Sequence, residues 1–163
     1  MVKENIRLDQ IGICLVCGAH DYEVSLERDH AFPRSMARKP NLGKIENPFH
    51  SVIFNRYNVF RICHEDHRLV DGKKNPAFSN DGFVTLNPVG LLTFLLNQYP
   101  ITKNRKYRDI QIENLLKTNE RFVEVAINLN GELPKDLVDK YQDAIDVAKQ
   151  FKEKLESLKT KHG

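Results

Sequence analysis

The most restrictive feature of this sequence is the placement of its three cysteines. Cys14 and Cys17 form a Cys-x2-Cys pair followed at once by Gly18, and Cys63 lies far along the chain. Such a pair points two thiolates at one metal ion, and a second group of ligands completes a tetrahedral zinc site. The odd number of cysteines and the lack of an apolar export signal argue against a disulfide framework. A fold built around structural zinc is therefore expected.

The fourth zinc ligand is left open by the sequence. Three residues after Cys63 the chain has Asp66 in place of a further cysteine. A carboxylate oxygen can bind zinc, so Asp66 is the first candidate. His64 is an alternative, and His20 is a more distant one. The remaining interpretation is that the cysteines are small buried hydrophobic residues without a metal.

Short strands and loops are expected in the first half of the chain. Alternating apolar and polar residues predict a strand over 22–29 and a second strand over 58–63. Two prolines and a glycine in 38–48 are typical of a loop. A short helix is expected over 64–70, ended by Asp71-Gly72.

The chain changes character near residues 75–88, after which helical periodicity dominates. Helices are predicted over 88–98 and 109–129, and Pro134 suits the first turn of a third helix. Apolar residues of that third helix recur at alternating steps of four and three, which makes a seam of about three heptads. The seam residues are Leu137, Tyr141, Ala144, Ala148, Phe151, Leu155 and Leu158.

Two interpretations of this seam stay open. In the first, it packs on the preceding helix to form a helical hairpin, against Ile112, Leu115, Phe122, Ala126 and Leu129. In the second, it forms a homodimer coiled coil or docks on a partner protein. The expected fold class is α+β, with one domain over 1–87 and a helical extension over 88–163.

Three motifs in the first half occur in a specific order. Asp29 and His30 form an Asp-His pair, Asn58 stands five residues before Cys63, and His67 stands four residues after that cysteine. Together with the cysteine knuckles, this pattern resembles the HNH endonucleases of the ββα-metal class. His30, Asn58 and His67 fall on the three positions that give this family its name. The resemblance covers under half of the chain and implies a small ββα-metal core.

This sequence departs from the family at one zinc position. Many zinc-containing members have a cysteine where this chain has Asp66. The departure concerns the structural zinc site, whose expected ligands are Cys14, Cys17, Cys63 and Asp66. It leaves the three name-giving positions unchanged.

Hydrolysis of a phosphodiester requires an activated water and stabilisation of negative charge. His30 is expected to be the general base, because an imidazole with a pKa near ~6.5 can accept a proton from water at neutral pH. Asp29 and His67 are expected to bind a catalytic divalent metal, Mg²⁺ or Mn²⁺, with Ni²⁺ or Zn²⁺ also compatible with a histidine ligand. By resemblance, Asn58 keeps the loop and the base in register. Neighbouring side chains of a strand face opposite ways, so Asp29 and His30 share a site only if the strand ends there, as Pro33 favours.

The net charge of +3 is too small to indicate nucleic-acid binding by itself. Over 28–74, however, ten Lys and Arg stand against five Asp and Glu, and a second basic cluster occupies 103–108. Either cluster can contact phosphates or be an ordinary solvated surface. Arg34 and Arg68 are the expected phosphate contacts. His50 is interpreted as a loop or packing residue, and His162 as a terminal one.

The sequence thus predicts a metal-dependent HNH endonuclease that cleaves DNA, although RNA is not excluded. A non-catalytic zinc-knuckle module that binds nucleic acid is the alternative. A third hypothesis is a nuclease subunit that is active only with a partner protein on its C-terminal helices. No apolar run approaches the length of a membrane span, so a cytoplasmic protein is expected.

Overall fold

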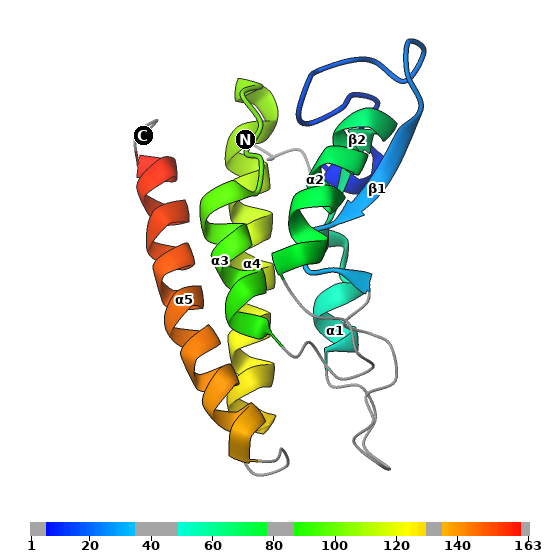
Figure 1. The fold of residues 1–163 in the computed structure, drawn as a ribbon. Helices are drawn as coiled ribbons and strands as arrows, with labels where there is room; N and C mark the ends of the chain where they lie inside the picture. Colours follow the sequence, from blue (N-terminus) through cyan, green and yellow to red (C-terminus); the bar gives the residue numbers. More distant parts are fainter. Residues whose placement is uncertain (1–5, 35–48, 78–86, 130–134, 161–163) are drawn as a thin grey trace.

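The computed structural model describes residues 6–34, 49–77, 87–129 and 135–160. Their fold is α+β, as predicted, because a small antiparallel sheet stands beside a larger helical part (Figure 1). The described elements are η1 (Leu8–Gln10), β1 (Leu26–His30), α1 (His50–Ile53), η3 (Arg56–Asn58), β2 (Val59–Cys63), α2 (His64–Ala77), α3 (Pro88–Gln98), α4 (Arg105–Asn128) and α5 (Lys135–Thr160).

The sheet consists of β1 and β2 in antiparallel register, with Asp29 opposite Phe60 and His30 opposite Val59. The first strand begins at Leu26, later than the predicted start at residue 22, because the residues before it form a turn. Helix α2 begins at the residue that follows β2. The two strands and this helix therefore bring the histidine-containing motifs close together.

Helix α2 is longer than the sequence predicts. The prediction that Asp71-Gly72 ends it is wrong, since the helix continues to Ala77. A glycine inside a helix costs only about 1 kcal/mol relative to alanine, which tertiary contacts can offset. Here the turn after Gly72 carries Lys74, whose side chain is buried and bonded to Asp29.

In the described part of the second half the chain forms the helices α3, α4 and α5 (Figure 1). Helix α3 has the predicted bounds, 88–98, and Asn87 caps it by accepting a hydrogen bond from the backbone of Gly90. Helix α4 begins at Arg105, four residues before the predicted start at 109, because Asn104 caps it. The loop predicted over 38–48 lies outside the described residues, as does His162.

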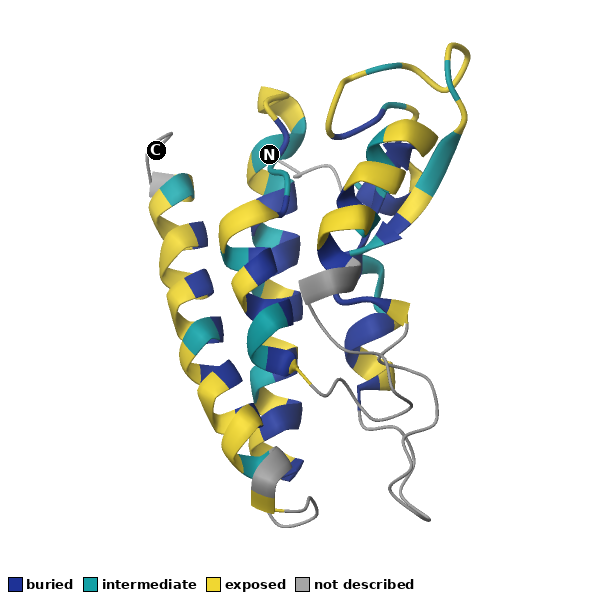
Figure 2. Ribbon diagram, in the orientation of Figure 1, coloured by how far each residue is buried: buried dark blue, intermediate teal, exposed yellow. Residues whose placement is uncertain are grey.

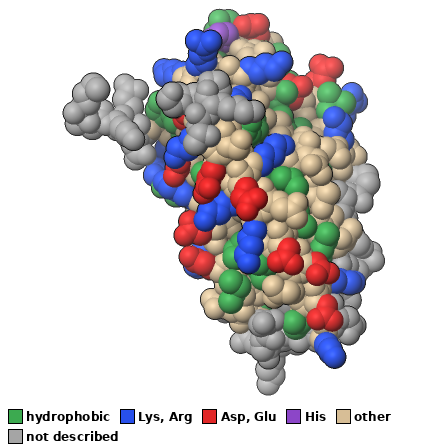
Figure 3. Space-filling model, turned by 90° about the vertical axis from the view of Figure 1, so that its left-hand side faces the viewer, with side chains coloured by type: hydrophobic (Ala, Val, Ile, Leu, Met, Phe, Trp, Pro, Cys, Tyr) green, Lys and Arg blue, Asp and Glu red, His purple; other side chains and the backbone are tan. Residues whose placement is uncertain are grey.

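The apolar seam of α5 faces the other helices of the same chain. It packs against both α3 and α4, and α3 is a neighbour that the hairpin interpretation did not include. Figure 2 shows the buried side of α5 turned toward these helices. Its described seam residues are buried, apart from a partly buried Leu158. Figure 3 shows acidic and basic side chains interspersed on the side where α5 lies.

One hydrophobic core spans both halves of the chain. Phe49 and Phe122 stack with ring centroids 5.5 Å apart, and each also packs on a further ring, Phe49 on Tyr141 and Phe122 on Phe32. These four side chains come from both sides of the predicted boundary at residues 87 and 88. None of the helices described is both long and apolar enough to cross a membrane.

Candidate metal centres and the histidine cavity

The Cys-x2-Cys pair forms a tight turn around the sulfur of Cys14, which is buried, whereas Cys17 is exposed. The backbone N–H groups of Val16 and Cys17 both point at Sγ of Cys14, each at 3.4 Å. Gly18 follows with a φ of 79°, in the left-handed region that glycine adopts without strain. Its N–H donates to the carbonyl of Cys14 at 2.9 Å. The sequence Cys-x2-Cys-Gly thus builds a turn that presents two sulfurs to one point.

Cys63 and Asp66 complete this cluster. Oδ2 of Asp66 lies 3.1 Å from Sγ of Cys63 and 3.2 Å from Sγ of Cys14, and the sulfurs of Cys17 and Cys63 are 3.9 Å apart. The four ligand atoms lie within 4.8 Å of one another. Of the three candidates for the fourth position, Asp66 is the one in the cluster.

The two rival histidines make other contacts. The side chain of His64 is 72% exposed and bonds Glu27 at 3.0 Å. His20 is exposed and stacks on Tyr22, with centroids 5.0 Å apart.

The donor set of this cluster fits zinc. Three sulfurs and one carboxylate oxygen lie within 4.8 Å of one another, and zinc takes ligands of these two kinds in tetrahedral sites. Burial raises the pKa of the Cys63 thiol to about 12, so without a cation this thiol stays protonated at neutral pH. A bound divalent ion deprotonates coordinating thiols and removes that penalty. The cluster can therefore hold a metal ion, and its chemistry is compatible with structural zinc.

A second group of metal-type ligands lies between β1 and α2. It consists of Asp29, His67 and Asp71, whose ligand atoms lie within 4.8 Å of one another. Nε2 of His67 is 3.4 Å from Oδ1 of Asp29 and 3.4 Å from Oδ2 of Asp71. The structure thus brings together the two predicted ligands of the catalytic metal and adds Asp71 to them.

Glu27 fixes the orientation of His67. Nδ1–H of His67 donates to Oε1 of Glu27 at 2.8 Å, which leaves Nε2 facing the two aspartates. The hydrogen bond with Asp29, together with Glu27 and Asp71, raises the pKa of His67 to about 9 against the opposing effect of burial. A carboxylate behind a histidine in this way is the arrangement that orients metal-binding imidazoles.

Both oxygens of Asp29 already have partners in the protein. Lys74 donates to Oδ1 at 3.1 Å, and the Tyr99 hydroxyl donates to Oδ2 at 2.6 Å. Burial would raise the pKa of this carboxyl, but Lys74, His67 and Tyr99 hold it well below its usual range. The aspartate is therefore ionised and fixed in position at neutral pH.

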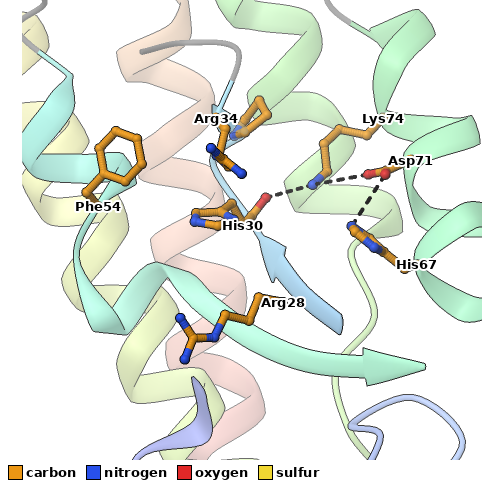
Figure 4. Close-up of a pocket in the computed structure, with 8 residues that line it drawn as sticks. Arg28, His30, Arg34, Phe54, His67, Asp71 and Lys74 are labelled. Atoms are coloured by element: carbon orange, nitrogen blue, oxygen red, sulfur yellow. Dashed lines mark hydrogen bonds and ion pairs between the residues drawn. The ribbon is translucent and has the colours of Figure 1, made fainter. Parts of the chain in front are cut away.

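His30 lies in a cavity of about 550 Å³ that is also lined by His67 and Asp71 of the second metal-type group. Arg28, Arg34, Phe54, His67, Asp71 and Lys74 also line it (Figure 4). Burial lowers the pKa of His30 to about 4 against the opposing effect of Asp29, and the cationic Arg34, Lys74 and Arg28 act in the same direction as burial. The imidazole is thus neutral at pH 7 and can accept a proton.

Asn58 is completely buried and ties three segments together. Its side-chain oxygen accepts from the backbone N–H of Phe32 at 2.8 Å, and its amide donates to the carbonyls of Phe32 at 2.9 Å and Ile53 at 3.0 Å. Since Phe32 follows His30 by two residues, these bonds fix the chain just where β1 ends. Asp29 and His30 stay on opposite faces of the strand, and Asp29 is linked to the cavity of His30 through His67 and Lys74, which bond it and line that cavity.

The two predicted phosphate contacts differ in their placement. Arg34 lines the cavity, whereas Arg68 projects from α2 as an exposed residue outside the set of cavity-lining residues. His50 begins the unpredicted helix α1 and packs its ring on Phe54, with centroids 4.6 Å apart.

Four residues of the site were not predicted from the sequence. Asp71 follows His67 by four residues, a spacing that places both on one helix face, and could have been found. Glu27 precedes Asp29 by two residues, which puts them on the same face of a strand. Lys74 and Tyr99 carry no local signal.

Comparisons of this chain with protein-family models, with curated proteins and with solved structures found no match.

Proposed function

We propose that this chain is a metal-dependent endonuclease of the HNH type that hydrolyses phosphodiester bonds of DNA, with β1, β2 and α2 as its ββα-metal core. The observation that carries the proposal is a single cavity lined by a neutral histidine, His30, and by a metal-type group formed with His67 and Asp71. A general base and a divalent-metal site side by side are what phosphodiester hydrolysis requires. Arg28 and Arg34 add positive charge at the same cavity.

In this proposal His30 accepts the proton of the attacking water. Its pKa of about 4 keeps it neutral over the physiological range, although it also makes the imidazole a weaker base than an unperturbed histidine. Asn58 holds the backbone behind it, and Arg34 binds a phosphate oxygen. In this proposal the position of the base depends on Asn58 and that of the phosphate on Arg34.

The catalytic divalent metal is assigned to Asp29, His67 and Asp71. When bound there, Mg²⁺ or Mn²⁺ supplies charge stabilisation at the phosphate and at the leaving 3′ oxygen. Glu27 orients His67, and Tyr99 holds one oxygen of Asp29 so that the other faces the histidine. Three protein ligands leave room for water and phosphate oxygens.

The cluster of Cys14, Cys17, Cys63 and Asp66 is assigned a structural role in this proposal. It joins the N-terminal turn to the end of β2 and the first turn of α2. A zinc ion there stabilises the sheet and helix that carry the site, without taking part in the reaction.

The test is nicking of supercoiled plasmid DNA by the purified, zinc-loaded protein with Mg²⁺ or Mn²⁺ varied. We expect metal-dependent nicking that is lost in His30→Ala by at least about a hundredfold, the scale of general-base catalysis. His20→Ala removes an exposed histidine that stacks on Tyr22 and is the matched control. If His30→Ala nicks as fast as the wild type, the catalytic assignment fails.

A second candidate is the non-catalytic zinc-knuckle module that binds nucleic acid. One observation favours it: the ammonium of Lys74 already satisfies Oδ1 of Asp29, as in a purely structural ion pair. In that case the protein would retain DNA on a filter but show no cleavage with any divalent metal. The plasmid assay therefore distinguishes the two candidates.

A further inference from the structure

Arg28 and Arg61 lie directly opposite each other on β1 and β2. Opposed residues of an antiparallel pair project from the same face of the sheet with Cβ atoms about 4.5–5.5 Å apart, and like charges there are destabilising. Among the residues that the structure describes, no carboxylate forms an ion pair with either arginine. The two opposed arginines thus have no ion-pair partner in the described part of the chain.

The Arg61 side chain has a further unmet requirement. Its Nε is buried and has no hydrogen-bond partner among the described residues. A buried donor without a partner is costly, and a bound water or anion can satisfy it. The backbone of Arg61 is held in place, since its carbonyl accepts from the N–H of Leu15 at 3.0 Å. The Arg61 side chain therefore extends from a backbone position that is held in place.

This pair faces the side of the sheet that carries the proposed base. Arg28 and His30 are two residues apart on β1 and so share a face, whereas Asp29 projects from the other face. Arg28 also lines the cavity of His30, together with Arg34 (Figure 4). The positive charge beside His30 consequently continues along the sheet from the cavity toward Arg61.

We propose that Arg28 and Arg61 form a phosphate-binding pair that holds a backbone phosphate of the nucleic acid next to the one attacked at His30. Guanidinium groups bind phosphate through two parallel N–H···O bonds, and one anion between two arginines cancels their repulsion. The inference rests on the proposed function for the identity of the ligand. It assigns a phosphate contact to the two arginines of the sheet, in addition to the contacts expected of Arg34 and Arg68.

The first test needs no catalysis and uses inorganic phosphate as the probe. Thermal unfolding of the zinc-loaded protein is measured with increasing phosphate at constant ionic strength. We expect phosphate to raise the unfolding temperature of the wild type but not of Arg28→Gln/Arg61→Gln, because only a ligand of the native state stabilises it. An equal rise in both proteins overturns the pair as a phosphate site. In the absence of phosphate, Arg28→Gln alone is expected to unfold at no lower a temperature than the wild type, because the substitution removes one of two opposed like charges.

The second test measures binding of a labelled DNA duplex without added Mg²⁺ or Mn²⁺, at several salt concentrations. Each single variant is expected to bind about tenfold more weakly, and the double variant to lower the slope of log affinity against log salt by about 1, as for one lost phosphate contact. Lys152→Gln on α5 removes one charge elsewhere and is the matched control.

The losses of DNA affinity caused by Arg28→Gln and by Arg61→Gln should not add up in the double variant, because both arginines hold the same anion. Unchanged affinity in the double variant overturns the inference. Weakened DNA binding in a protein that never cleaves DNA upholds the pair while the proposed nuclease activity fails.

Discussion

The ammonium group of Lys74 lies 3.1 Å from Oδ1 of Asp29, and the side chains are only 3% and 1% exposed. The same oxygen is 3.4 Å from Nε2 of His67. A lysine thus neutralises the carboxylate that the proposed metal would bind. A divalent ion bound at the proposed site would therefore compete with the Lys74–Asp29 ion pair.

Replacing Lys74 by methionine is expected to tighten Mn²⁺ binding by at least about tenfold, because the competing charge is removed from a buried site. Without metal, the same variant should lose roughly 3 kcal/mol of unfolding free energy, because Asp29 is left buried without its cationic partner. Titration calorimetry with Mn²⁺ and denaturant unfolding check both effects.

The adjacent and exposed Lys73 supplies the control for this variant, as Lys73→Met. The interpretation is contradicted if Lys74→Met binds Mn²⁺ no more tightly than the wild type while remaining folded. A large gain in thermal stability of Lys74→Met on adding Mn²⁺ would support competition at Asp29 directly.

Metal binding at this group should depend on pH through His67. Its pKa of about 9 in the metal-free protein means that a proton must leave before Nε2 can bind a metal. Apparent Mn²⁺ affinity should therefore rise by up to about tenfold for each pH unit between pH 6 and 8, and level off above pH 9. Calorimetry in buffers of different ionisation enthalpy counts the proton released.

The same pKa has the opposite effect on the stability of the metal-free fold. The folded-state pKa of about 9 exceeds the unfolded value of about 6.5, so the contribution of His67 is complete below pH 6.5 and disappears as the pH rises to 9. Between pH 6.5 and 9 we therefore expect the unfolding free energy of the metal-free protein to fall while its Mn²⁺ affinity rises. A flat metal affinity between pH 6 and 8 would exclude His67 as a ligand.

The structural metal site predicts one bound zinc per chain. Asp66→Cys should retain it, since a fourth thiolate is a common zinc ligand, whereas Asp66→Ala and Cys14→Ala should lower both zinc content and unfolding temperature. Elemental analysis and thermal unfolding provide the measurements. Glu65→Ala, at an exposed neighbouring position on α2, is the control. If the wild type contains no zinc and the variants unfold at the same temperature as the wild type, the cysteines are packed side chains without a metal.

The sequence predicts most of the residues that the structure brings together in the candidate site, because its signals are local. The Cys-x2-Cys spacing dictates a turn, and Asp66, one turn along from Cys63, reaches the same point. The spacing of Asn58 from Cys63 likewise places the asparagine just before β2. Such features depend on backbone geometry over a few residues, which a single sequence reveals.

Long-range contacts could not be predicted in this way. Lys74 is 45 positions from Asp29 and Tyr99 is 70 positions from it, and neither belongs to a motif. Their contacts exist because α2 continues past Gly72 and because α3 packs on α2. The end of α2 was predicted wrongly for the same reason, since a buried lysine in the next turn outweighs the low helix propensity of glycine.

Tyr99 couples the helical half of the chain to the metal-type group, and its hydroxyl can be removed selectively. Tyr99→Phe keeps the ring that packs on Phe60 and Phe94 but loses the 2.6 Å hydrogen bond to Asp29. A hydrogen bond to a buried charge contributes about 1.5–3 kcal/mol, so unfolding free energy should fall by that amount. Mn²⁺ affinity should fall by about 10–100-fold, because residues behind a ligand set its orientation. Tyr141→Phe, at a buried tyrosine that packs on Phe49, should lower neither the affinity nor its pH dependence. If Tyr99→Phe loses stability but binds Mn²⁺ with unchanged affinity, the hydroxyl stabilises the fold without positioning Asp29 for metal.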